Sequence, residues 1–95
     1  MKAAIFAVAR GWVYAGVYEE VYKPTGMYYR VTDGFCVRYW GTTSGLGQLQ
    51  ITGPTEETKL DPIKCVEFHE LQMCGMYPLS KDDWRGFVDH AKADK

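Results

Sequence analysis

The stretch that decides the fold is Met27–Trp40, MYYRVTDGFCVRYW. Its aromatic and β-branched residues favour extended strands. Asp33-Gly34 interrupts it near the centre, and this dipeptide is typical of a type I′ turn, which needs positive φ at both central residues. The pattern therefore predicts a hairpin of strands 27–32 and 35–40, with Gly34 at positive φ.

An earlier hairpin is predicted from the N-terminal segment. Two apolar and aromatic runs, 3–9 and 12–22, flank Arg10-Gly11. A two-residue loop there sets a register in which Ala7 faces Tyr14, so that large rings lie opposite small side chains.

A turn sequence, Lys23-Pro24-Thr25-Gly26, separates the two hairpins. Pro presets φ at its second position and Gly suits its fourth. Neither face of the resulting sheet is cleanly polar. We therefore expect both faces to be covered, by curling into a small barrel, by a helix or by another subunit.

The second half of the chain contains a long connection, one more strand and a helix. Residues 41–62 form the glycine-rich connection, in which Leu46 and Leu49 can anchor one helical turn. A strand is predicted over 66–74, with a bulge near His69-Glu70 where the apolar parity changes.

The C-terminal helix is the clearest element and is predicted over 80–93. Ser80 and Asp83 have the spacing of a capping box. An apolar stripe follows at helical spacing, formed by Trp84, Phe87, Val88 and Ala91.

The predicted fold class is α+β, mainly β. It comprises two N-terminal antiparallel hairpins in a small sheet or open barrel, the long Gly-rich loop, one more strand and the helix. We assign 1–95 to a single domain, with the sheet over 3–77.

Composition excludes several classes of protein. The chain has 95 residues, is 46% hydrophobic and carries a net charge of −1 without a basic block. General nucleic-acid binding is therefore not expected. No stretch approaches the roughly 20 apolar residues that span a bilayer. Three cysteines without a C-x-x-C pair argue against a disulfide framework and favour a reducing cytoplasm.

Catalytic and metal sites are not predicted. His69 and His90 lie in ordinary structural settings, and no nucleophile motif surrounds any Ser or Cys. The spacing of Cys65, His69 and Cys74 is loosely compatible with zinc but lacks the turn-held ligand pairs of structural zinc sites. We predict neither an enzyme nor a cofactor.

The best candidate binding site is the loop after Trp40. It offers glycine backbone N–H groups and three hydroxyls, which can form an anion-binding concavity, and Arg38 can add a guanidinium fork. The alternative is that the glycines only turn the chain. The predicted ligand-binding residues are Arg38, Trp40, Thr42, Thr43, Ser44 and Gln48.

A second candidate is an aromatic face, formed by Trp12, Tyr14, Tyr18 and Tyr22. Such rings can stack a nucleobase or fill a groove of a partner. The alternative, which we favour for at least half of the rings, is a second core layer under the terminal helix.

Three runs resemble a domain of unknown function found in tailed-phage genomes: residues 9–17, residues 37–49 and Gly53-Pro54-Thr55. The resemblance covers residues 3–77, and the helix from Ser80 departs from the family pattern. It implies a phage product made in the cytoplasm of the bacterial host, with no known activity.

Small phage proteins of this kind commonly act on the host. The resemblance therefore implies a non-catalytic binding protein that counters host defence, and we expect sequestration of a small anionic, nucleotide-type signal. Inhibition of a host protein, or a structural or housekeeping role, are the alternatives. We also expect a homo-oligomer, because a chain of 95 residues has little to cover two apolar sheet faces.

Overall fold

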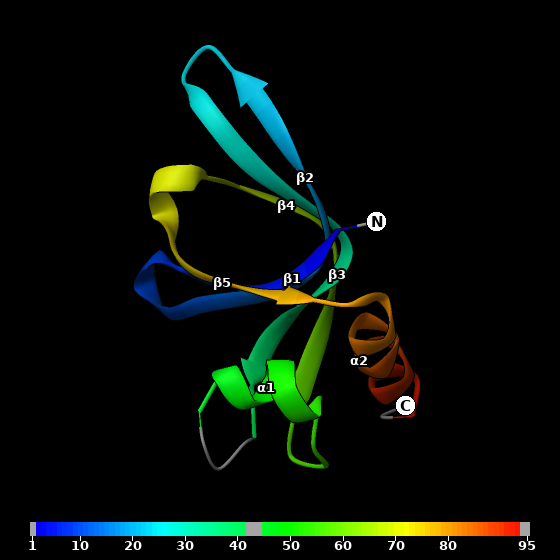
Figure 1. Cartoon of the computed structure of the whole chain (residues 1–95). Helices are drawn as coiled ribbons and strands as arrows, with labels where there is room; N and C mark the ends of the chain where they lie inside the picture. The colour runs from blue at the N-terminus through cyan, green and yellow to red at the C-terminus, as the bar shows by residue number, and fades with distance from the viewer. Residues whose placement is uncertain (1, 42–44, 94–95) are drawn as a thin grey trace.

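The computed structural model describes residues 2–41 and 45–93. Within these residues, one antiparallel sheet of five strands, in the order β4-β3-β2-β1-β5, carries two α-helices (Figure 1). The mainly β fold class is therefore confirmed. The elements are β1 (Ala3–Val8), η1 (Ala9–Gly11), β2 (Trp12–Lys23), β3 (Gly26–Tyr39), α1 (Gly47–Thr52), β4 (Lys59–His69), η2 (Glu70–Gln72), β5 (Met73–Leu79) and α2 (Lys81–Ala93).

The predicted hairpin turn at Asp33-Gly34 is wrong, because β3 runs straight through it. Asp33 has positive φ (51°), whereas Gly34 does not. Pairing with β2 shifts register here, so that Gly16 of β2 faces both residues of the dipeptide. β3 is hydrogen-bonded to a neighbouring strand on each side. These long-range ladders outweigh the local turn preference, and a bulge accommodates the positive φ.

The first hairpin forms with a different register from the predicted one. Its loop is the three-residue η1, so that Ala7 pairs with Val13 and not with Tyr14. Positive φ at both Arg10 and Gly11 closes this loop. The extra loop residue shifts pairing by one position and moves Tyr14 to the same side as Phe6. The predicted turn between Lys23 and Gly26 is confirmed and joins β2 to β3.

The strand predicted over 66–74 is in fact two strands at opposite edges of the sheet. β4 ends at His69, η2 turns the chain, and β5 pairs with β1. The change of apolar parity at His69-Glu70 thus marks a strand end and not a bulge. The long connection contains α1, and the anchor role predicted for Leu49 is confirmed by its complete burial.

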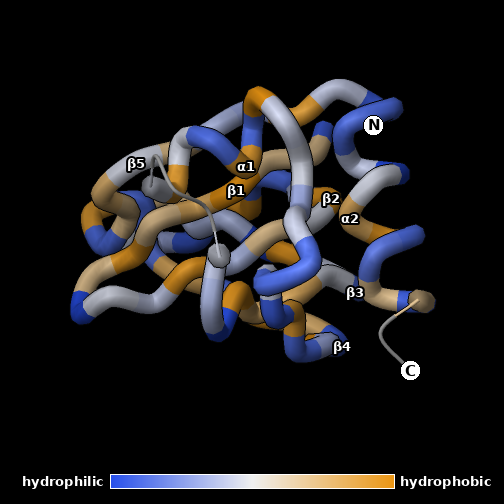
Figure 2. Tube along the Cα trace, turned by 90° about the horizontal axis from the view of Figure 1, so that it is seen from below, coloured by the Kyte–Doolittle hydropathy of each residue, from blue (hydrophilic) through white to orange (hydrophobic). Residues whose placement is uncertain are grey.

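The helix face of the sheet carries the larger hydrophobic core, and Figure 2 shows hydrophobic residues of β1 at the centre of the molecule. From α2, Trp84 and Phe87 are buried against this face. The predicted capping box is confirmed: the Asp83 N–H donates to Ser80 Oγ (3.0 Å), and the Ser80 N–H donates to Asp83 Oδ2 (3.2 Å). No helix among the described residues is long and apolar enough to cross a membrane.

The inner face of the sheet carries a second core, built mainly from aromatic rings. Phe6 of β1 lies 5.3 Å from Phe68 of β4, measured between ring centroids, although two strands separate them in the sheet. The sheet must therefore curl to bring these rings together, and the curl of the strands is visible in Figure 1. Both faces are thus covered within one chain, which removes the reason given above for a homo-oligomer.

Candidate functional site

Arg38 lies near the end of β3 and pairs with a carboxylate of its own chain. Its Nε is 3.0 Å from Asp61 Oδ2 on β4. The two side chains are 64% and 49% exposed, so the pair lies at the surface. Arg38 is also the position at which the pairing of β3 with β4 shifts register. The Arg38 guanidinium, which we predicted to bind an anionic ligand, is therefore already paired with the Asp61 carboxylate.

Trp12 shares a depression with this ion pair. The depression has a volume of about 250 Å³ and is lined by Gly11, Trp12, Val13, Cys36, Val37, Arg38 and Asp61. Trp12 is 54% exposed, and its ring stacks on Tyr14 at a centroid distance of 6.4 Å and an interplanar angle of 5°. The structure thus brings one residue of the predicted ligand site together with one residue of the predicted aromatic face.

Cys36 contributes a thiol to the same depression. Partial burial raises the pKa of this thiol, and the neighbouring Asp61 carboxylate raises it further. Burial likewise raises the pKa of the adjacent Tyr14 hydroxyl, with a smaller contribution from Cys36. A thiol with a raised pKa remains protonated at neutral pH and is a weak nucleophile.

The remaining predicted ligand-binding residues belong to the loop after β3. Thr42, Thr43 and Ser44 lie outside the described residues. Trp40 is 39% exposed, and Gln48 is partly buried in the first turn of α1. The backbone at the start of this loop is fixed, because Thr58 Oγ1 donates to the Trp40 carbonyl (2.6 Å) and Thr55 Oγ1 donates to the Gly41 carbonyl (2.7 Å).

The predicted aromatic face separates into two parts. Tyr14 and Tyr18 pack against the core of the inner face, with Tyr18 edge-on to Phe6 at 5.0 Å. Trp12 and Tyr22 are exposed at opposite ends of β2. The second core layer that we favoured for half of the rings exists, but the terminal helix does not cover it. The curled sheet does.

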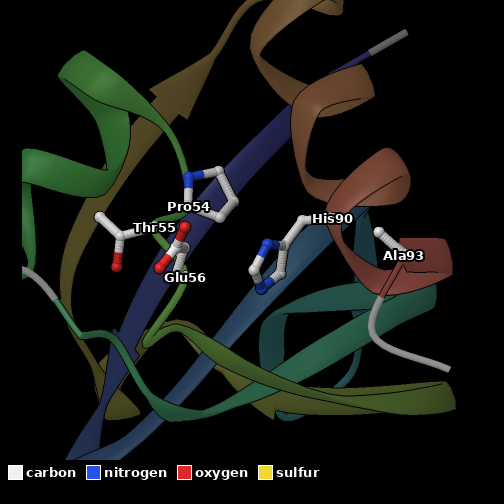
Figure 3. A pocket seen from close by; sticks show the side chains of 5 residues that line it. All are labelled: Pro54, Thr55, Glu56, His90 and Ala93. Atoms are coloured by element: carbon white, nitrogen blue, oxygen red, sulfur yellow. The ribbon is translucent and has the colours of Figure 1, made fainter.

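A second depression was not found from the sequence and lies between the loop before β4 and the end of α2 (Figure 3). Its volume is about 370 Å³, and its lining residues are Pro54, Thr55, Glu56, His90 and Ala93. Glu56 and His90 are far apart in the chain, and no spacing rule connects them. The turn sequence Gly53-Pro54 was the available signal for a fixed loop there.

Metal ligation has no geometric support within residues 2–41 and 45–93. No three His, Cys, Asp or Glu side chains gather there in a way that could hold a metal ion. Cys36, Cys65 and Cys74 are all free thiols.

Comparison with known proteins adds no assignment: no family model, curated protein or solved structure matches the chain.

Proposed function

We propose that the chain is a non-catalytic binding domain that recognises another protein through the surface around Trp12 and Arg38. The observation that carries this proposal is the exposed Arg38–Asp61 pair beside the exposed ring of Trp12. Trp, Tyr and Arg are the residue types that dominate binding energy at protein interfaces. Tyr39 and Trp40 follow Arg38 directly and are also exposed.

Charge favours a protein partner over a small anion. A phosphate that approached Arg38 would also meet the Asp61 carboxylate, which lines the same depression. It would have to displace that carboxylate and then tolerate its repulsion. A protein surface can instead provide a carboxylate for Arg38 and a donor for Asp61, and thereby satisfy both members of the pair.

Size points in the same direction. Pockets that enclose a small molecule typically have volumes of about 300–1,000 Å³ and bury most of the ligand. The depression beside Trp12 has a volume of about 250 Å³ and is lined in part by Gly11 and two valines. It can accept one side chain of a partner, whereas a nucleotide would extend beyond it.

The resemblance to a phage domain suggests where such a partner would be found. A phage product that acts in the bacterial cytoplasm would meet host proteins there, so we propose inhibition of a host protein as the biological role. Sequestration of a nucleotide signal is the competing role, and the exposed face of Trp12 is the feature that favours it, because an indole can stack on a base.

The test is comparative affinity capture from a bacterial lysate, followed by titration of the purified partner. The wild type is compared with Trp12→Ala, Arg38→Ala and the matched control Tyr22→Ala. Tyr22 is 78% exposed on the same strand and does not line the depression. We expect the partner to bind the wild type and Tyr22→Ala equally, and to bind Trp12→Ala at least about tenfold more weakly, as for an interface hot spot.

The contradicting result is specific. A nucleotide that raises the melting temperature of the wild type but not of Arg38→Ala, with no protein retained in a manner dependent on Trp12, would assign the surface to ligand sequestration.

A further inference from the structure

Glu56 and His90 line opposite sides of the depression between the 53–58 loop and the last turns of α2. Figure 3 shows the imidazole reaching from α2 toward the loop, where the Glu56 carboxylate lies next to Pro54, while Ala93 lies on α2 beyond the imidazole. Within residues 2–41 and 45–93, the Glu56 carboxylate has neither a hydrogen-bond nor an ion-pair partner. A carboxylate in this position is ready to accept from a ligand.

His90 is held in one orientation and presents an acceptor. Its Nε2 lies 2.8 Å from the carbonyl oxygen of Thr58. A carbonyl only accepts, so Nε2 carries the hydrogen, and the neutral ring then has no proton on Nδ1. Nδ1 lies on the side of the ring that faces Glu56 (Figure 3). The depression therefore offers two acceptors, one of them negatively charged.

The loop that carries Glu56 is fixed by a second set of hydrogen bonds. Thr58 is fully buried, and its Oγ1 accepts from the Thr55 N–H at 2.9 Å and donates to the Trp40 carbonyl at 2.6 Å. The Thr58 N–H in turn donates to the Thr55 carbonyl at 3.1 Å. Glu56 is thus part of a closed turn that is tied to the end of β3, and the site is preorganised before any ligand binds.

We propose that this depression binds a primary alkylammonium group. An ammonium has three N–H donors, which suit the Glu56 carboxylate and His90 Nδ1 together. The methylenes behind the charge can lie on Pro54 and Ala93, as the stem of a lysine does on apolar surface. A divalent metal ion is a poorer fit, because two protein ligands are fewer than stable metal sites use. The site does not depend on the surface around Trp12.

The direct test is a titration followed by amide NMR at about pH 8, where a primary alkylammonium carries its charge. n-Butylammonium represents a free amine, and Nα-acetyl-lysine N-methylamide represents a lysine side chain of a partner protein. 1-Butanol is the uncharged control. We expect saturable shifts of the Glu56, His90 and Ala93 amides with at least one of the two ammonium probes and not with 1-butanol. The probe that binds more tightly identifies the source of the ligand.

Two variants connect the binding to the proposed groups. Glu56→Gln removes the charge, and we expect it to raise Kd at least about tenfold, as for a lost charged hydrogen bond. Glu57→Gln changes the same net charge at an exposed neighbour that does not line the depression, and its Kd should stay within about twofold.

His90→Gln tests the imidazole separately. Its side-chain amide can still donate to the Thr58 carbonyl, but it places no acceptor at Nδ1, so we expect a folded protein with weakened binding. Shifts that are non-saturating for both ammonium probes, that 1-butanol reproduces, or that survive Glu56→Gln unchanged would overturn the proposal.

Discussion

Arg38 Nε and Asp61 Oδ2 lie 3.0 Å apart at the surface where β3 and β4 end their pairing. The sequence predicts that Arg38 binds an anionic ligand, but this contact shows that its guanidinium is already paired with a carboxylate. An arginine already opposed by a carboxylate, beside an exposed Trp12, is better suited to the charged and apolar groups of a protein surface than to a phosphate.

The Arg38–Asp61 pair should contribute little to stability. Exposed ion pairs contribute about 0–1 kcal/mol, so we expect Asp61→Asn to change the free energy of unfolding by less than about 1 kcal/mol in urea titrations. A loss of more than about 2 kcal/mol would show that the pair holds the β3–β4 edge together and is not available for binding.

The bulge in β3 should make Gly34 intolerant of a side chain. A Cβ at Gly34 would overlap the carbonyl oxygen of Ala15 and lie 3.1 Å from the Cα of Gly16. We expect Gly34→Ala to cost about 1–3 kcal/mol, as overpacking does. Gly86→Ala is the control, and it should change the free energy of unfolding in the opposite direction, because Gly86 lies in α2 and an added Cβ there would meet open space. It should stabilise by about 0.5–1 kcal/mol. Equal effects of the two changes would show that the bulge is misplaced.

His69 should hold two turns together. Its Nε2 lies 3.0 Å from the Thr25 carbonyl oxygen, and its Nδ1 accepts from the Leu71 N–H at 3.1 Å. His69→Ala removes both hydrogen bonds, each worth about 0.5–1.5 kcal/mol. We expect the Leu71 amide to exchange with solvent at least about tenfold faster, while the Trp84 amide, bonded to the Ser80 carbonyl, keeps its rate. Unchanged exchange at Leu71 would contradict this linkage.

Glu67 should make stability depend on pH in the acid range. Hydrogen bonds from Lys23 and from Arg30 lower the pKa of this carboxyl below its ordinary value of 4.5. A lowered folded-state pKa contributes stability above the unfolded-state pKa and loses it as the pH falls through the folded-state value. We therefore expect Glu67→Gln to be less stable than the wild type at neutral pH, with the difference shrinking as the pH falls below about 4.5.

Glu70→Gln provides the control, since Glu70 is exposed and has no described ion pair. It should show a smaller difference at neutral pH. A wild-type advantage over Glu67→Gln that persists unchanged into strong acid would contradict the assignment.

Local patterns in the sequence predicted part of the fold well. The capping box of Ser80 and Asp83 and the stripe around Trp84 and Phe87 depend on neighbours within one helix, so spacing alone reveals them. Asp33-Gly34 has an equally clear local signal, yet pairing on both sides of β3 overrides it. Strand pairing depends on residues that are far apart in the chain, so a short segment of sequence does not predict it.

The candidate sites show the same limit. Arg38 and Trp12 were predicted as members of two different sites, and only the β2–β3 pairing brings them into one depression. Glu56 and His90 line one depression because α2 packs beside the 53–58 loop, and no short-range pattern in the sequence connects the two residues.

The three tryptophan side chains provide the most direct measurement of the central claim. Trp12 lines the proposed binding surface and Trp40 is exposed close behind Arg38 in the chain, whereas Trp84 of α2 is buried against the sheet. Each indole N–H gives its own NMR signal. On addition of the captured protein partner, we predict that the Trp12 and Trp40 indole signals shift and that the Trp84 signal does not. A partner that binds without moving the Trp12 signal would contradict the proposal that this surface recognises a protein.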